Sequence, residues 1–111
     1  MKIKIQDHND VTIVELMGDL DSESNAQLKN TISDLISKNR VGIILEMTNI
    51  AFIDSEGLER LLWARDYCNE NTCQLRLAGL DENCSEIMKV TRLDREFDRY
   101  TELAEAVISF A

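Results

Sequence analysis

The sequence predicts one α/β domain spanning residues 1–111, with a mostly parallel or mixed sheet of four to five strands, an N-terminal hairpin and about four helices. The apolar run Val41–Met47 is too short for an independent helix and is typical of a strand buried on both faces. Strand-like and helix-like segments then alternate along the chain, which favours right-handed crossovers between parallel strands. A hydrophobic content of 44% over 111 residues, with no proline, fits a single unit with a real core.

The chain begins with a predicted β-hairpin. Lys2–Gln6 alternates apolar and polar residues as a strand does, Asp7–Asp10 is a turn that includes His8, and Val11–Met17 returns as the second strand. Gly18–Asp21 is then expected to end this strand and to lead into a helix.

The first helix is predicted from about Ser22 to Lys38. Ser24, followed by Gln27 at the spacing of a capping box, offers an alternative start. The helix has one apolar stripe, formed by Leu28, Ile32, Leu35 and Ile36.

The second half repeats the alternation of helix and strand. A helix after Ser55 is expected to run to about Asn69, with Leu58, Leu61 and Leu62 at helical spacing. A strand is then expected at Gln74–Ala78, followed by a short helix from Asn83 or Ser85 to Lys89 and a loop at Arg92–Asp94. A short edge strand is expected at Glu96–Tyr100. The last helix is expected to be capped by Thr101, with Leu103, Val107 and Ile108 facing inward.

Ser55 is the residue on which a functional hypothesis depends. It stands between the buried strand and the following helix, so its hydroxyl is expected at a helix N-terminus, at the sheet edge where α/β proteins usually meet ligands. Three interpretations compete. Ser55 or Asp54 caps the helix; Ser55 is a nucleophile, which the missing G-x-S-x-G motif and the single, distant histidine disfavour; or Ser55 accepts a regulatory phosphate.

Little other chemistry is visible. Asp19 and Asp21 favour a turn and a helix cap over a metal or acid–base pair. Trp63 lies off the leucine stripe of its helix, near Arg60 and Arg65, and is a candidate interface anchor. The three cysteines cannot all pair, form no C-x-x-C motif and are interpreted as reduced structural thiols. Cys73 is expected to be the most exposed.

The charge restricts the possible partners. A net charge of −9 disfavours direct binding to nucleic acids or anionic membranes, because their phosphates would be repelled. No apolar run approaches the length of a membrane span, and Met1–Ile5 alternates as a strand and lacks a signal-peptide core. The sequence therefore predicts a cytoplasmic protein with no cofactor and no metal site.

Taken together, these segments resemble the STAS domain, and most closely the bacterial anti-sigma factor antagonists. The resemblance covers nearly the whole chain. It is carried by Phe52–Leu58 with Ile43–Met47 and Ile50 before it, by Gly18–Asp21, by Leu75–Gly79, by Leu93–Phe97 and by Glu102–Val107.

The resemblance implies a phosphorylation-controlled partner switch. The serine matching Ser55 is phosphorylated by a partner that is both anti-sigma factor and serine kinase, and a PP2C-type phosphatase reverses the reaction. The protein itself is then no enzyme, and it binds the kinase only when Ser55 is unphosphorylated. The residues expected to meet the partner are Asp19, Asp21, Asp54, Ser55, Glu56, Gly57, Glu59, Arg60 and Trp63.

Three positions depart from the family pattern. Glu56 and Glu59 stand where antagonists commonly carry a small residue and a glycine, and Glu46 replaces the usual aspartate. Because two of these acids flank Ser55, the alternative is a STAS binding subunit of another assembly: a signalling switch without a sigma factor, or a transporter-associated subunit.

Overall fold

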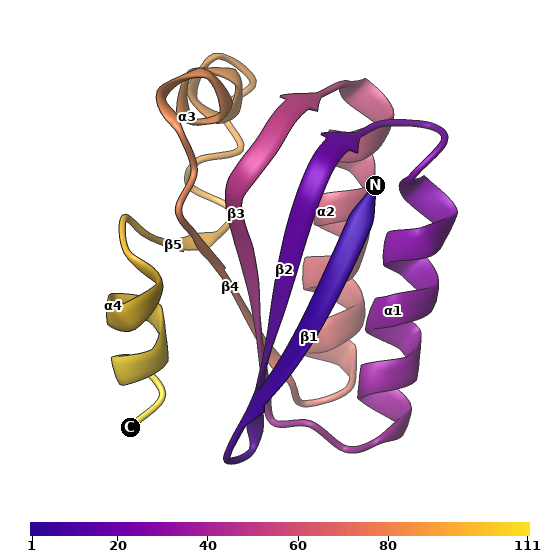
Figure 1. Cartoon of the computed structure of the whole chain (residues 1–111), viewed down its shortest axis with the longest axis vertical. Helices are drawn as coiled ribbons and strands as arrows, with labels where there is room; N and C mark the ends of the chain where they lie inside the picture. The colour runs from indigo at the N-terminus through magenta and orange to yellow at the C-terminus, as the bar shows by residue number, and fades with distance from the viewer.

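Five strands and four helices make up the computed structural model, which describes all residues from 1 to 111 (Figure 1). The strands lie in the sheet in the order in which they occur in the chain; β1 pairs antiparallel with β2, and all other neighbours are parallel. The predicted α/β class with an N-terminal hairpin is confirmed. The elements are β1 (Lys2–His8), β2 (Val11–Leu20), α1 (Asn25–Ser37), β3 (Gly42–Ile53), α2 (Ser55–Glu70), β4 (Gln74–Ala78), α3 (Glu82–Val90), β5 (Asp98–Tyr100) and α4 (Leu103–Ile108).

The two faces of the sheet are covered differently. Parallel strands are added in one direction, so right-handed crossovers bring α1 and α2 to the same face, and Figure 1 shows these helices side by side. Their apolar stripes pack on β2, β3 and β4 in a core of 21 buried residues. On the opposite face α4 covers a smaller apolar cluster, formed by Val11, Ile13, Ile44, Ala78 and Ala106. No helix is both long and apolar enough to cross a bilayer.

The central strand β3 is buried as predicted, but it is longer than expected. Ile43, Ile44 and Leu45 have no exposed surface. The strand does not end at Met47, because it continues to pair with β2 beyond two irregularities in register, as far as Leu20 opposite Ile53. For the same reason Gly18–Asp21 does not end the preceding strand, which continues to Leu20.

Several predicted helix starts are wrong by one to three residues. The first helix begins at Asn25 and not at Ser22, which belongs to a turn; the alternative start is confirmed in position, because Ser24 is the N-cap of α1, although its side chain makes no capping hydrogen bond. α3 begins at Glu82, because the Asp81 side chain accepts a hydrogen bond from the Cys84 amide at 2.8 Å. Near the C-terminus, Glu102 and not Thr101 occupies the cap position of α4. Ile108 does not face inward as predicted but is 70% exposed, and Ala106 is buried instead. The edge strand is shorter than predicted and contains only Asp98–Tyr100.

All three cysteines are free and buried. The predicted exposure of Cys73 is wrong: only 2% of its surface is exposed, because its amide donates to the Cys68 carbonyl at 2.9 Å and its side chain joins the main core. Burial, together with a hydrogen bond to Asp81, raises the pKa of the Cys84 thiol to about 11. Cys84 is therefore an unreactive, protonated thiol at neutral pH.

Candidate functional site

The ends of β2 and β3 bring two predicted site segments together. The Asp54 amide donates to the Leu20 carbonyl at 3.2 Å, and Asp19 lies opposite Phe52 in the paired strands. The loop after β2 and the first turn of α2 therefore meet at one edge of the sheet, at the upper end in Figure 1. Phe52 is 52% exposed there, a large apolar side chain that the sequence pattern did not single out.

Gly57 makes this meeting of loop and helix possible. A Cβ atom at this position would lie 2.2 Å from the Leu20 carbonyl oxygen and 2.9 Å from its carbon, which is far inside van der Waals contact. Because the obstacle is backbone, a side chain would force the two segments apart.

Asp54, and not Ser55, caps α2. Its Oδ1 accepts from the Gly57 amide at 2.9 Å, and its carbonyl accepts from the Leu58 amide at 3.0 Å. Ser55 is the first helical residue and is exposed, and its hydroxyl makes no hydrogen bond to another protein group. Of the two caps that the sequence left open, the structure uses the aspartate, so the serine hydroxyl has no structural task.

The loop between β2 and α1 is built around Ser24, which is only 3% exposed. Its Oγ donates to the Asp19 carbonyl at 2.8 Å and accepts from the Asp21 amide at 2.9 Å. The Asp21 side chain in turn accepts from the amides of Glu23 and Ser24, at 3.0 and 3.1 Å. Asp21 thus closes the turn. The sequence reading of Ser24 as a capping-box residue missed this role.

The outer face of α2 carries the remaining site residues. Glu56 and Glu59 are exposed, whereas Arg60 and Trp63 are partly buried. The Arg60 guanidinium lies 5.1 Å from the Trp63 ring centroid, and its Nε donates to Oδ1 of Asn25 on α1. Trp63 stacks on Tyr67 with 4.9 Å between the ring centroids.

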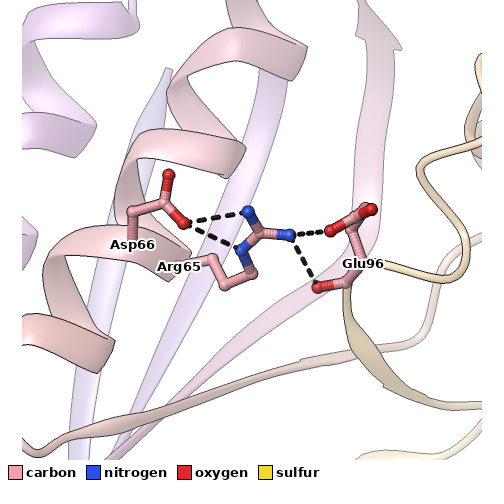
Figure 2. Close-up of polar contacts among 3 residues, drawn as sticks. All are labelled: Arg65, Asp66 and Glu96. Carbon is pink, nitrogen blue, oxygen red and sulfur yellow. Dashed lines mark hydrogen bonds and ion pairs between the residues drawn. The ribbon is translucent and has the colours of Figure 1, made fainter.

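Arg65 belongs to a different arrangement, shown in Figure 2. Its Nε and Nη2 donate to Oδ1 of Asp66 at 3.1 and 2.9 Å, and its Nη1 donates to the Glu96 carbonyl at 3.2 Å and to the Glu96 carboxylate. The hydrogen bond to Asp66 is the largest cause that raises the pKa of Arg65. Every nitrogen of this guanidinium is occupied, so Arg65 fastens α2 to the segment before β5.

We expect Arg65→Gln to lower the free energy of unfolding by about 1 kcal/mol. The change removes the bonds to Glu96, but the arginine side chain is 24% exposed and the glutamate side chain 50% exposed, so solvent reduces the effect. Urea unfolding measures the difference. Arg95→Gln, at an exposed neighbouring arginine, is the matched control and should change stability by less than about 0.5 kcal/mol. Equal effects of the two substitutions would contradict the structural role of Arg65.

No group of three or more histidine, cysteine, aspartate or glutamate side chains converges as a set of metal ligands. Beside the loop after β2 lies an open hollow of about 450 Å³, lined by Met1, Gly18, Asp19, Asp21, Glu23 and Ser24. Its lining is mostly polar and acidic. This edge of the molecule is therefore better suited to contact a protein surface than to enclose a small molecule.

The chain belongs to the STAS domain family, whose family model matches residues 2–106. An anti-sigma F factor antagonist of Paenibacillus polymyxa is 23% identical in an alignment of 111 positions that covers 93% of this chain and 95% of the relative. The crystal structure of a candidate anti-sigma factor antagonist from Thermotoga maritima superimposes with a TM-score of 0.89, at 21% identity, covering 96% of this chain and 92% of that one. The phosphorylated form of the Bacillus cell fate determinant SpoIIAA superimposes with a TM-score of 0.75, at 18% identity, covering 99% and 100%.

Proposed function

We propose that this protein is an anti-sigma factor antagonist of the partner-switching type, controlled by phosphorylation of Ser55. The observation that carries the proposal is the exposed Ser55 hydroxyl at the start of α2, which is left without a hydrogen bond because Asp54 caps the helix. In this proposal a cytoplasmic anti-sigma factor with serine kinase activity is both the partner and the phosphorylating enzyme, and a PP2C-type phosphatase reverses the modification. The family relationship to anti-sigma factor antagonists supports this choice of partner.

A phosphate on Ser55 would change the surface more than the fold. The N-terminus of a 16-residue helix attracts an anion, so α2 tolerates the group. Asp54 and Glu56 flank the serine. Asp19 lies at the end of the neighbouring strand β2, and Asp21 lies in the loop that follows it. Adding about two negative charges here takes the net charge of the chain from −9 to about −11 and concentrates the increase in an acidic patch.

The phosphorylated patch is therefore poorly suited to be buried in an interface. Removing these charges from water carries a desolvation cost that the unphosphorylated surface does not have. A penalty of only ~3 kcal/mol weakens binding by roughly a hundredfold, which is sufficient for a switch. Catalysis then resides in the kinase and the phosphatase, and this chain serves as substrate and ligand.

The proposal is tested by affinity purification from the native host with Ser55→Ala and Ser55→Asp baits, read by mass spectrometry. The alanine bait cannot be phosphorylated and is expected to retain a serine kinase of the anti-sigma type. The aspartate bait is expected to lose it, with an affinity roughly a hundredfold lower when the purified proteins are titrated. Aspartate suits a helix N-terminus, so thermal unfolding of both variants should match the wild type.

Equal recovery of the kinase by both baits would refute the switch. Recovery of the same transporter or scaffold proteins by both baits would instead support the alternative, a constitutive STAS subunit of another assembly. The fold alone does not choose between these functions, since one fold carries many.

A further inference from the structure

Arg60 differs from the other partly buried arginines of the chain. Four arginines are partly buried, and three of them have a carboxylate within 4.0 Å. Arg60 has none. The three pairs are Arg40 with Asp7, Arg65 with Asp66 and Glu96, and Arg76 with Asp98.

A carboxylate is available to Arg60 but is not used. Glu56 lies four residues earlier on the same helix, the spacing at which opposite charges normally pair. The Arg60 guanidinium instead turns to the Trp63 ring, 5.1 Å away, and to Oδ1 of Asn25, which accepts from Nε. Its two terminal nitrogens donate to no protein acceptor, so the fork that binds a carboxylate through two hydrogen bonds is free.

The surroundings hold this guanidinium in place. Trp63 is fixed by its stacking on Tyr67, at 4.9 Å and an interplanar angle of 13°. Lys29 of α1 lies 5.9 Å from the same Trp63 ring and also has no ion pair, so two uncommitted cations converge in a chain with net charge −9. A rigid, partly desolvated arginine beside an aromatic stack is the usual composition of a binding hot spot.

We propose that Arg60 is a specificity anchor that binds a carboxylate of the partner protein, with Lys29 adding positive charge beside it. The inference rests on the proposed function, because it identifies a contact of the same interface. The acidic residues near Ser55 favour a singly charged carboxylate over a phosphate, since a second negative charge would be repelled more strongly. Arg60 lies five residues after Ser55, about 140° around the helix, so the anchor and the phosphorylation site are separate contacts.

The test uses three baits in the native host: Ser55→Ala, Ser55→Ala with Arg60→Gln, and Ser55→Ala with Arg99→Gln. Arg99 is exposed on β5, the edge strand beyond β4, and controls for the loss of one positive charge. The protein that the first and third baits retain is then purified, and its dissociation constant is measured for wild type, Arg60→Gln and Arg60→Lys. We expect Arg60→Gln to lower the affinity for the partner roughly 10- to 100-fold and Arg60→Lys to restore only part of it. The effect of Arg60→Gln should be coupled to the neutralisation of one aspartate or glutamate of the partner.

Equal affinity of Arg60→Gln and Arg99→Gln would overturn the inference, and so would a loss that couples to no carboxylate of the partner. Competition by inorganic phosphate at constant ionic strength, seen with wild type but not with Arg60→Gln, would assign the site to a phosphate and also overturn it. A different result would refute the proposed function alone: Ser55→Ala and Ser55→Asp would retain the partner equally, while Arg60→Gln would still weaken binding to that partner. Baits that retain no partner at all would contradict both.

Discussion

Replacing Gly57 with alanine is expected to lower the free energy of unfolding by about 1–3 kcal/mol. Helix propensity alone predicts the opposite sign, because alanine is more favourable than glycine inside a helix by about 1 kcal/mol. The difference arises from the Leu20 carbonyl oxygen, which would lie 2.2 Å from the new Cβ atom. Relief of this clash requires the first turn of α2 to move away from the end of β2. That movement strains the bond from the Asp54 amide to the Leu20 carbonyl.

Urea unfolding of Gly57→Ala and Gly42→Ala compares a clash with backbone atoms and a clash with a side chain. A Cβ atom at Gly42 also meets an obstacle, at 2.4 Å, but that obstacle is the ring of Phe110 near the C-terminus. A ring at the end of a side chain can shift where a carbonyl of a paired strand cannot, so Gly42→Ala should cost less. A Gly57→Ala protein as stable as the wild type would show that the loop and the helix are not in close contact.

The order of the elements was predictable from the sequence because each has a strong local signal. β3 begins with a short apolar run and α1 has a single apolar stripe, and both elements exist where the pattern predicts them, although their ends differ. The ends of the elements were less predictable. Residues after Met47 alternate poorly, and only pairing with the end of β2 keeps them in a strand. Asp81 and Glu102 act as caps among several polar residues of similar propensity, so packing and not local preference selects the residue at the helix start.

At the candidate site the sequence placed Ser55 correctly at the start of a helix, because a buried strand and an apolar helical stripe define the boundary between them. It left open which residue caps α2, since Asp54 and Ser55 have similar capping preference. Contacts between distant segments had no sequence signal. Asn25 on α1 accepts a hydrogen bond from Arg60 on α2. Phe52 is exposed within a strand whose other apolar residues are largely buried.

Ser24→Ala is expected to lower the free energy of unfolding by about 1 kcal/mol, because it removes two partly buried hydrogen bonds that the buried Ser24 hydroxyl makes to the backbone. The Asp21 amide loses its acceptor and the Asp19 carbonyl loses its donor, while the methyl group of alanine supplies neither. Ser22→Ala is the matched control, since Ser22 is an exposed residue of the same turn. Urea unfolding should separate the two variants, and hydrogen exchange of the amides of residues 19–24 should become faster only in Ser24→Ala. Equal stability of the two would contradict the role assigned to Ser24.

The same pair of variants tests whether the loop belongs to the interface. Asp19 and Asp21 are proposed to meet the partner, and Ser24 holds both backbones in position. In the Ser55→Ala background, Ser24→Ala should therefore weaken binding to the partner at a temperature where the domain is still folded, whereas Ser22→Ala should not. Loss of stability without loss of affinity would mean that the loop supports the fold only. The partner surface would then be restricted to α2, where Ser55 supplies the switch and Arg60 the anchor.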